Sequence, residues 1–210
     1  MAGLNARELR PGLWRWTAPH PDWEPTEEQD GPADWPRDVG SVLAVLRDTV
    51  VLVDPLVPDD GWNELDALVS GRPAAVVTTI DFHGRSREAA VVHYGASEEV
   101  PLGVDVLSLS GLGERIVWLP AYRALVPGDR LLGFGGDTPL RLCPDQWLRY
   151  LPGKPTRDEL REALAPLLAL PIELVLVSHG EPVLENGRAE LERALGAPDP
   201  IVTNPARIRH

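Results

Sequence analysis

The sequence is poor in several features that would each point to a particular class of protein. Cys143 is its one cysteine, so no intrachain disulfide can form. No run approaches the roughly 18 apolar residues that a membrane-spanning helix needs, and the opening residues, MAGLNARELRPG, lack the apolar centre of a signal peptide. We therefore expect a cytoplasmic protein that does not bind a membrane.

Positive charge is also scarce. The chain has 20 Lys and Arg against 32 Asp and Glu, which gives a net charge of −12 at pH 7. A field of this sign repels polyanions, so we expect no nucleic acid partner. An anionic small-molecule substrate would need local positive charge to offset that field.

The rest of the composition is typical of a soluble globular protein. Hydrophobic residues make up 43% of the chain and charged residues 25%, and 210 residues are enough to bury a sizeable core. The 22 prolines lie between apolar runs and indicate well-defined turns. We expect a single domain over residues 1–210, with its core in 11–195 and a polar tail over 198–210.

Apolar runs bounded by turn residues predict the secondary structure. The expected strands are 11–18, 40–46, 50–53, 74–79, 104–109, 115–119, 123–126 and 172–177, and a further apolar segment covers 131–136. The expected helices are 60–69, 86–94, 145–151, 156–168 and 187–195. Hairpins and strand–helix units alternate along the chain. This order favours an α/β (α+β) fold with two mixed β-sheets and helices outside them.

Two of these helices carry capping signals. Thr156 and Glu159 have the spacing of a capping box at the start of one helix. Ser86 is placed to cap the start of another, which Gly95 would close. Both signals predict where the helices begin.

Polar residues with catalytic chemistry follow three of the apolar runs. His83 comes after the strand in AAVVTTIDFHGRSR, Asp129 ends the PGD after RALV, and His179 follows VLVS. In sheets flanked by helices, ligand sites gather at strand ends. We therefore expect these three residues to meet at one site, joined by Asp81 and Arg85 from the first segment.

The succession of VLVDP, TTIDFHGRS, RIVWLPAYRALVPGD and VLVSHG resembles the metallo-β-lactamase superfamily. The resemblance runs from about Pro11 to Leu195. It implies a four-layer αββα sandwich with a metal site at the rim between the two sheets. Members commonly carry a His-x-His-x-Asp-His motif, a later histidine, a bridging Gly-Asp and a final histidine after a strand.

The resemblance also implies that the usual first metal position is lost. The two leading histidines of the motif fall on Thr79 and Asp81, its last histidine falls on Gly84, and the later histidine falls near Ser110. Hydroxyl groups are poor ligands for zinc, which takes nitrogen, sulfur or carboxylate oxygen. A two-metal hydrolase is therefore not expected.

By the same resemblance, the second metal position keeps a sufficient ligand set. The aspartate of the motif falls on His83, the bridging aspartate on Asp129 and the final histidine on His179. Two imidazoles and a carboxylate suit one divalent ion, zinc first, with iron or manganese as alternatives. Asp81 would be a fourth ligand or the catalytic base that orients water, and Asp54 would support the metal loop.

A metal held in this way lowers the pKa of bound water and supports hydrolysis. The substrate would be a small-molecule ester, thioester, amide or phosphoester. Arg85, in the loop before a helix, could bind a carboxylate or phosphate of that substrate. It could equally pair with an acid such as Asp81. The sequence does not indicate an oligomeric state.

A second reading has no metal and no catalysis. In it, His83 and His179 hydrogen-bond to Asp129 or Asp81 and fill a degenerate site, because buried polar groups can satisfy one another. The protein would then be a ligand-binding or structural member of the same fold. The tryptophans at positions 14, 16, 23 and 35 could line an apolar pocket in such a protein, or pack in its core. Whether the chain is an enzyme stays open at this point.

Overall fold

The computed structural model describes residues 3–23, 36–109, 114–137, 139–151 and 153–196. One sheet has the strand order β1-β2-β3-β4-β5, and its members are β1 (Arg7–Arg10), β2 (Leu13–Pro19), β3 (Asp38–Val45), β4 (Val50–Val53) and β5 (Ala74–Val77). Neighbouring strands are antiparallel except β4 and β5, which are parallel. The predicted hairpin of β3 and β4 is confirmed.

A second sheet has the order β11-β8-β7-β6. Its members are β6 (Asp105–Ser108), β7 (Arg115–Leu119), β8 (Ala124–Val126) and β11 (Leu174–Val175). β11 runs parallel to β8, and the other pairs are antiparallel. A two-stranded sheet contains β9 (Leu131–Gly133) and β10 (Leu140–Leu142). Both main sheets are therefore mixed, as expected.

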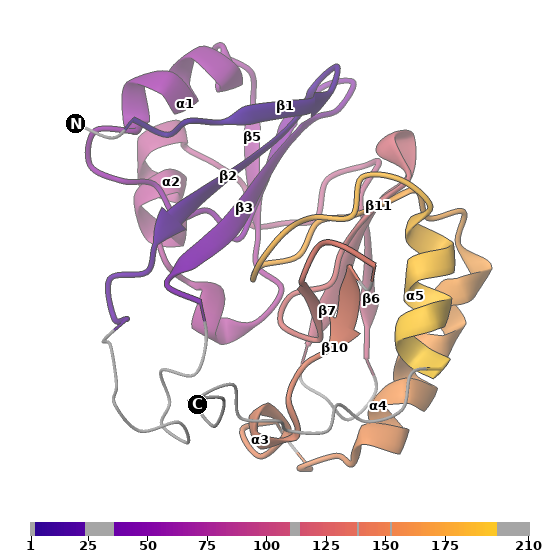
Figure 1. Ribbon diagram of the computed structural model, residues 1–210. Coiled ribbons are helices and arrows are strands. Elements are labelled where there is room, and N and C mark those ends of the chain that lie inside the picture. Colours follow the sequence, from indigo (N-terminus) through magenta and orange to yellow (C-terminus); the bar gives the residue numbers. More distant parts are fainter. Residues whose placement is uncertain (1–2, 24–35, 110–113, 138, 152, 197–210) are drawn as a thin grey trace.

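The longer helices lie on the outer faces of the two sheets (Figure 1). The α-helices are α1 (Trp62–Val69), α2 (Arg87–Tyr94), α3 (Asp145–Leu148), α4 (Arg157–Leu164) and α5 (Gly187–Gly196). Three short 3₁₀ helices are η1 (Asp81–His83), η2 (Pro120–Tyr122) and η3 (Ala165–Ala169). α1 and α2 cover the first sheet, whereas α4 and α5 cover the second. The layers are thus αββα, which confirms the expected architecture.

The central strands are apolar on both faces because each lies between two layers. In β4, Val50 and Leu52 pack against the helices of the first sheet, while Val51 and Val53 face the second sheet. β7 shows the same alternation, with Val117 facing the first sheet. Side chains of a strand alternate between its faces, so a strand buried on both sides reads as a continuous apolar run. This is why VVLV and RIVWL were visible in the sequence.

The capping signals have different outcomes. Thr156 and Glu159 form the predicted capping box at the start of α4. Gly95 ends α2 in the left-handed conformation, as predicted. Ser86 stands at the N-cap of α2, but its hydroxyl accepts a hydrogen bond from the Val57 N–H at 2.9 Å and makes no capping bond. The expectation for the Ser86 side chain is therefore wrong, because the chain after β4 competes for it.

Several element boundaries also differ from expectation. β1 and β10 were not predicted, and the segment 131–136 stops being a strand at Gly133. The predicted helix 156–168 becomes α4 followed by η3, since Pro166 has no N–H for a regular helix. The predicted strand 172–177 pairs as a strand only at Leu174–Val175. In the part of the chain that the structure describes, no helix has both the length and the apolarity to cross a membrane.

Candidate metal centre

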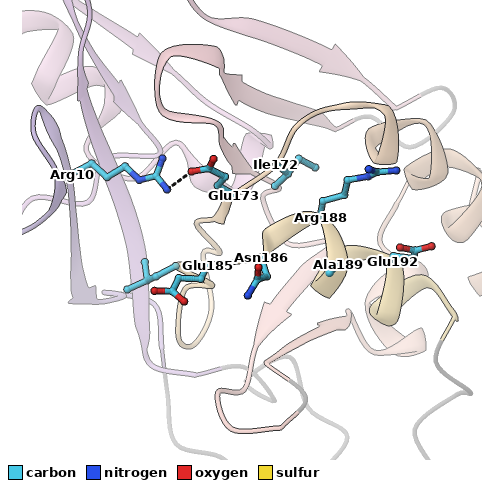
Figure 2. Close-up of a pocket in the computed structure, with 9 residues that line it drawn as sticks. Arg10, Ile172, Glu173, Glu185, Asn186, Arg188, Ala189 and Glu192 are labelled. Atoms are coloured by element: carbon cyan, nitrogen blue, oxygen red, sulfur yellow. Dashed lines mark hydrogen bonds and ion pairs between the residues drawn. The ribbon is translucent and has the colours of Figure 1, made fainter.

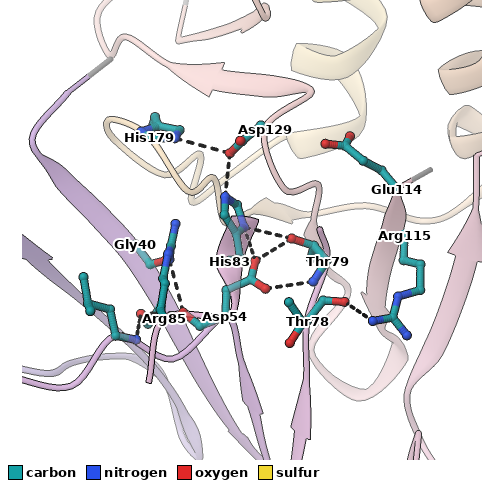
Figure 3. Close-up of polar contacts among 12 residues, drawn as sticks. Gly40, Asp54, Thr78, Thr79, His83, Arg85, Glu114, Arg115, Asp129 and His179 are labelled. Atoms are coloured by element: carbon teal, nitrogen blue, oxygen red, sulfur yellow. Dashed lines mark hydrogen bonds and ion pairs between the residues drawn. The ribbon is translucent and has the colours of Figure 1, made fainter. Parts of the chain in front are cut away.

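Three side chains from distant parts of the sequence converge at the rim between the two sheets (Figure 3). One ligand atom from each of His83, Asp129 and His179 lies within 4.8 Å of the others. His83 ends η1, which follows β5, while Asp129 follows β8 and His179 follows β11. The strand ends of both sheets therefore bring together the three residues that the sequence singled out.

A close approach of two loops places Asp129. Gly128, just before it, has φ of +58°, a left-handed conformation that glycine adopts readily. A Cβ at this position would lie 3.0 Å from the Thr79 hydroxyl oxygen. A side chain at position 128 would therefore strain the backbone and push Thr79 away from its partners.

His179 is held by its backbone on two sides. It forms an antiparallel bridge with Val39 of β3, and its carbonyl accepts a hydrogen bond from the Gly133 N–H at 2.9 Å. The next residue, Gly180, lies so close to Gly133 that a Cβ would meet the Gly133 carbonyl oxygen at 1.9 Å. The Trp147 ring packs at an edge against the imidazole, with 5.4 Å between ring centroids. The imidazole therefore has a defined place in the rim.

Asp54 fixes His83 from the inside of the fold. Its carboxylate, 1% exposed, accepts hydrogen bonds from the Thr79 N–H at 2.8 Å and from the Thr79 hydroxyl at 2.6 Å. The second of these carboxylate oxygens also lies 2.9 Å from His83 Nδ1. An ionised carboxylate can only accept, so His83 Nδ1 carries a proton and donates it to Asp54. His83 Nε2 then faces Asp129 Oδ1 at 2.9 Å.

These contacts shift the pKa values of the cluster. Burial opposes protonation of His83, but the charges of Asp129 and Asp54 outweigh it and raise the pKa of His83 to about 9. Burial would raise the pKa of both carboxyl groups. The charge of His83 and the hydrogen bonds instead hold the pKa of Asp54 below its usual value, and that of Asp129 well below. Without a metal, the cluster is an imidazolium between two carboxylates.

The donor atoms suit one divalent ion. Asp129 Oδ1 lies 2.9 Å from His83 Nε2 and 3.3 Å from His179 Nε2, yet this buried oxygen accepts no well-directed hydrogen bond from the described residues. Ligand atoms of a tetrahedral zinc ion, with bonds of about 2.0–2.1 Å, lie roughly 3.4 Å apart. The two distances from Asp129 Oδ1 are near or somewhat below that value, and all the ligand atoms lie within 4.8 Å of one another. Three protein ligands would leave one position open, as in catalytic zinc sites.

Asp81 does not join the cluster. It begins η1, is exposed, and is not one of the three converging groups. A 3₁₀ helix has about three residues per turn, so side chains two positions apart are separated by roughly 120° around the helix axis and point in different directions. The structure does not bring Asp81 into this group, and its role as a catalytic base or fourth ligand stays a prediction.

Arg85 has a structural task that the sequence did not show. Its Nη1 donates to the Gly40 carbonyl at 2.9 Å and to the Asp54 carbonyl at 3.2 Å, which ties β3 to the end of β4. It also lines the cavity beside the three ligands. Its role in substrate binding stays a prediction. Ser110, where the resemblance places a lost histidine, lies outside the described residues.

A cavity of about 370 Å³ opens over the cluster. Residues that the sequence did not suggest form much of its lining, and these are His20, Phe82, Trp147, Arg149 and Tyr150. Three of them belong to α3 and the residues just after it, far along the chain from β5. His20 lies in the loop that follows β2. Its position just after the end of β2 was the one available signal, because polar residues at strand ends mark sites.

The tryptophans considered for a pocket are placed elsewhere. Trp16 is buried and donates its indole N–H to the Leu56 carbonyl at 2.7 Å, and Trp14 packs against the same core cluster. Trp23 is not part of the cavity lining, and Trp35 lies outside the described residues. For Trp14 and Trp16, core packing is therefore the correct reading.

Another hollow, of about 580 Å³, lies at the start of β11, whereas His179 follows its end (Figure 2). Arg10 and Arg188 share its lining with Glu173, Glu185 and Glu192. Arg10 pairs with Glu173 at 2.6 Å, which links the two halves of the sandwich. This hollow thus has charges of both signs, and no group of metal ligands forms among its described residues.

No family model and no curated protein matches the sequence. Solved structures do match. The metallo-β-lactamase DIM-1 is 12% identical, covers 92% of this chain and 99% of its own, and has a TM-score of 0.57. The chain has the metallo-β-lactamase fold.

Two further structures support this identification of the fold. A metallo-β-lactamase from Erythrobacter litoralis is 17% identical, with 90% of this chain and 89% of its own covered and a TM-score of 0.57. FIM-1 from Pseudomonas aeruginosa, solved in a mono-zinc form, is 14% identical over 93% of this chain and 98% of its own, with a TM-score of 0.57. At such identities the likeness establishes a divergent metallo-β-lactamase fold and does not establish the reaction.

Proposed function

We propose that this protein is a metal-dependent hydrolase with a single-metal site. The observation that carries the proposal is the convergence of His83 Nε2, His179 Nε2 and Asp129 Oδ1 on one cavity. Zinc is the first choice of metal, with iron or manganese as alternatives, because the donor set is two imidazoles and one carboxylate. The substrate would be a small ester, thioester, amide or phosphoester.

Asp54 supports the proposal because it prepares His83 as a ligand. Its carboxylate accepts the Nδ1 proton of His83, so the lone pair of the neutral imidazole is on Nε2, facing Asp129. A carboxylate behind a ligating histidine fixes the ring orientation and increases the basicity of the ligand nitrogen.

A bound divalent ion would supply an acidified water as a nucleophile near neutral pH. The chain itself would place the substrate. His20 accepts the Asp22 N–H at Nδ1, at 3.2 Å, so in its neutral form it holds its proton on Nε2. Burial, and next the charge of Arg85, lower the pKa of His20. In this proposal the neutral His20 keeps its Nε2 proton and donates a hydrogen bond from Nε2 to an oxygen of the substrate.

One observation favours a second candidate, a metal-free ligand-binding protein. Each ring nitrogen of His83 lies 2.9 Å from a carboxylate oxygen, so both nitrogens have partners without an ion. A metal must displace the Nε2 proton of His83, and its binding is therefore linked to pH. A cytoplasmic location and the absence of nucleic acid partners stay predictions under either candidate.

Metal content and hydrolysis, measured together, test the proposal. We expect purified protein, or protein incubated with zinc, iron or manganese, to hold about one equivalent of metal by elemental analysis. The metal-loaded protein should hydrolyse at least one member of a panel of small esters, thioesters, amides and phosphoesters. A His83→Ala, His179→Ala double variant should lose both properties. Absence of metal from the wild type after each incubation would overturn the hydrolase proposal in favour of the second candidate.

A further inference from the structure

Two large apolar side chains are exposed at the same cavity. Phe82 is 70% exposed and Tyr150 is 67% exposed, although both line the space over the metal ligands. Trp147 lines the cavity as well and packs against His179. Exposed apolar groups that gather at a hollow mark a binding surface. The aromatic side chains therefore indicate that a bound molecule has an apolar part.

The aromatic groups belong to two different halves of the sandwich. Phe82 is in η1, between β5 and α2, directly beside His83. Trp147 is in α3, and Tyr150 follows that helix. A molecule in the cavity would therefore contact aromatic side chains supplied by both halves. Aromatic rings give large contact area with few rotatable bonds, so they suit this task.

The same cavity has a cation that forms no ion pair with the described residues. Arg149 is exposed, lines the cavity and makes no ion pair with any residue of the described ranges. The cavity lining also contains the exposed Asp22, whose N–H donates to His20, while the remaining charged lining residues have partners or tasks of their own. Arg130 pairs with Glu114, Asp129 pairs with His83, and Arg85 binds two backbone carbonyls. The protein has a net charge of −12, so an anionic ligand needs local positive charge in order to bind. Arg149 supplies such a charge beside the candidate metal centre.

We propose that the cavity binds a small anionic ligand in two parts. A carboxylate or phosphate pairs with Arg149, and an adjoining aromatic or aliphatic group lies against Phe82, Trp147 and Tyr150. The guanidinium group is suited to both anions, which it can bind through two hydrogen bonds. The volume of about 370 Å³ is near the lower end for ligand pockets and so selects a small molecule. The inference rests on the proposed function in that this ligand is the substrate to be hydrolysed.

Binding to the metal-free protein tests this assignment separately from catalysis. The full chain, freed of metal with a chelator, is titrated by calorimetry with phenylacetate, phenyl phosphate, neutral phenylacetamide and acetate. We expect at least one of the two aromatic anions to bind about tenfold or more tightly than the amide, because one charge-assisted contact is worth that much. Acetate, which has no apolar part, should bind more weakly than phenylacetate.

Three variants assign the contacts. Arg149→Gln should abolish the advantage of the aromatic anions over the amide and leave amide binding unchanged. Tyr150→Ala should weaken the binding of all three aromatic probes. Arg47→Gln, which changes an arginine that is 94% exposed in the β3–β4 turn, should bind every probe as the wild type does. Arg149 and Tyr150 are surface residues, and circular dichroism verifies that these variants fold.

The outcomes separate the two proposals. Equal binding of phenylacetate, phenyl phosphate and phenylacetamide, or an anion preference that persists in Arg149→Gln, would overturn the ligand assignment even if the metal-loaded protein hydrolyses esters. An anion preference that requires Arg149 would support the assignment even if no metal and no hydrolysis were found. In that case the ligand is bound without being cleaved, and only the proposed hydrolase function fails.

Discussion

Asp129 and Arg130 are consecutive residues, but they belong to two different buried charge clusters. Asp129 meets His83 and His179 at the cavity. Arg130 turns to Glu114 and Cys143. Both clusters are buried and both contain groups with shifted pKa values, so burial alone does not tell a functional site from a structural ion pair.

The Arg130 cluster is the more deeply buried of the two, although Arg130 also borders the cavity. The paired side chains of Arg130 and Glu114 are 3% and 1% exposed, and Arg130 Nη1 donates to the Cys143 sulfur at 3.4 Å. Burial raises the pKa of Glu114 to about 7, against the opposing charge of Arg130. Burial likewise raises the pKa of the Cys143 thiol to about 11, so this thiol stays protonated. Such a thiol is unreactive, and the cluster fastens the loop after β8 to the core.

The Asp129 cluster differs in convergence and access. Two imidazole nitrogens approach a single carboxylate oxygen, and that oxygen lies beside a cavity open to small molecules. In the Arg130 cluster one cation meets one anion, which leaves no donor set for a third species. The candidate site therefore differs from the structural ion pair in two ways. Several donor atoms converge at one point, and a cavity gives a ligand access to them.

The largest effect is expected from breaking the Arg130 cluster. Glu114→Gln leaves the buried charge of Arg130 without its partner, so the free energy of unfolding should fall by about 3–5 kcal/mol. Urea denaturation measures this, with the exposed Glu185→Gln as a control that should change stability by less than about 0.5 kcal/mol. A loss below about 1 kcal/mol in Glu114→Gln would contradict the structural role of this pair.

A second effect separates the clusters by pH. The pKa of His83 is raised from 6.5 to about 9, so its stabilising contribution is fully present below pH 6.5 and is lost as the pH rises through 9. The metal-free protein should therefore lose up to about 3 kcal/mol of stability over this range. Urea denaturation in chelator at neutral and alkaline pH measures the loss, and His83→Gln should abolish it. Equal stability of the wild type at both pH values would contradict the ion pairs drawn for His83.

The third effect concerns Asp54, whose carboxylate accepts the Nδ1 proton of the candidate ligand His83. Asp54→Asn places an amide where His83 Nδ1 donates, which favours the tautomer with its proton on Nε2. Zinc affinity should fall by about ten- to a hundredfold, as for other carboxylates behind ligating histidines. Competition with a coloured chelator measures the change. Asp66→Asn is a matched control, since Asp66 pairs with the exposed His93 at 2.8 Å. Equal zinc affinity in both variants would show that Asp54 does not prepare the ligand.

The fold could be predicted because the strands between its layers are continuous apolar runs in the sequence. Strands such as β4 and β7 are buried on both faces and therefore stand out in the sequence. β1 could not be found in this way, because RELR is a polar edge strand that pairs through its backbone. The expected helix 156–168 was too long because Pro166 has no N–H for a regular helix, and α4 gives way to η3 just before it.

The candidate site was predictable only in its innermost part. His83, Asp129 and His179 follow strands, and strand ends meet at a rim by topology. The position of Asp81 depended on the short turn of η1, which the two-residue spacing did not indicate. The part of the cavity lining formed by Trp147, Arg149 and Tyr150 is far along the chain from His83. Its position is set by tertiary packing and leaves no local signal.

The most direct test of the account is a zinc titration of metal-free protein by calorimetry, comparing the wild type with Asp129→Asn and Asp81→Ala. We expect the wild type and Asp81→Ala each to bind one equivalent of zinc, because Asp81 lies outside the group of His83, Asp129 and His179. We expect at least a hundredfold weaker binding in Asp129→Asn, which removes the charged ligand that both imidazoles approach. No zinc binding by the wild type, or binding that is insensitive to Asp129→Asn, would contradict the assignment of His83, Asp129 and His179 as a metal centre.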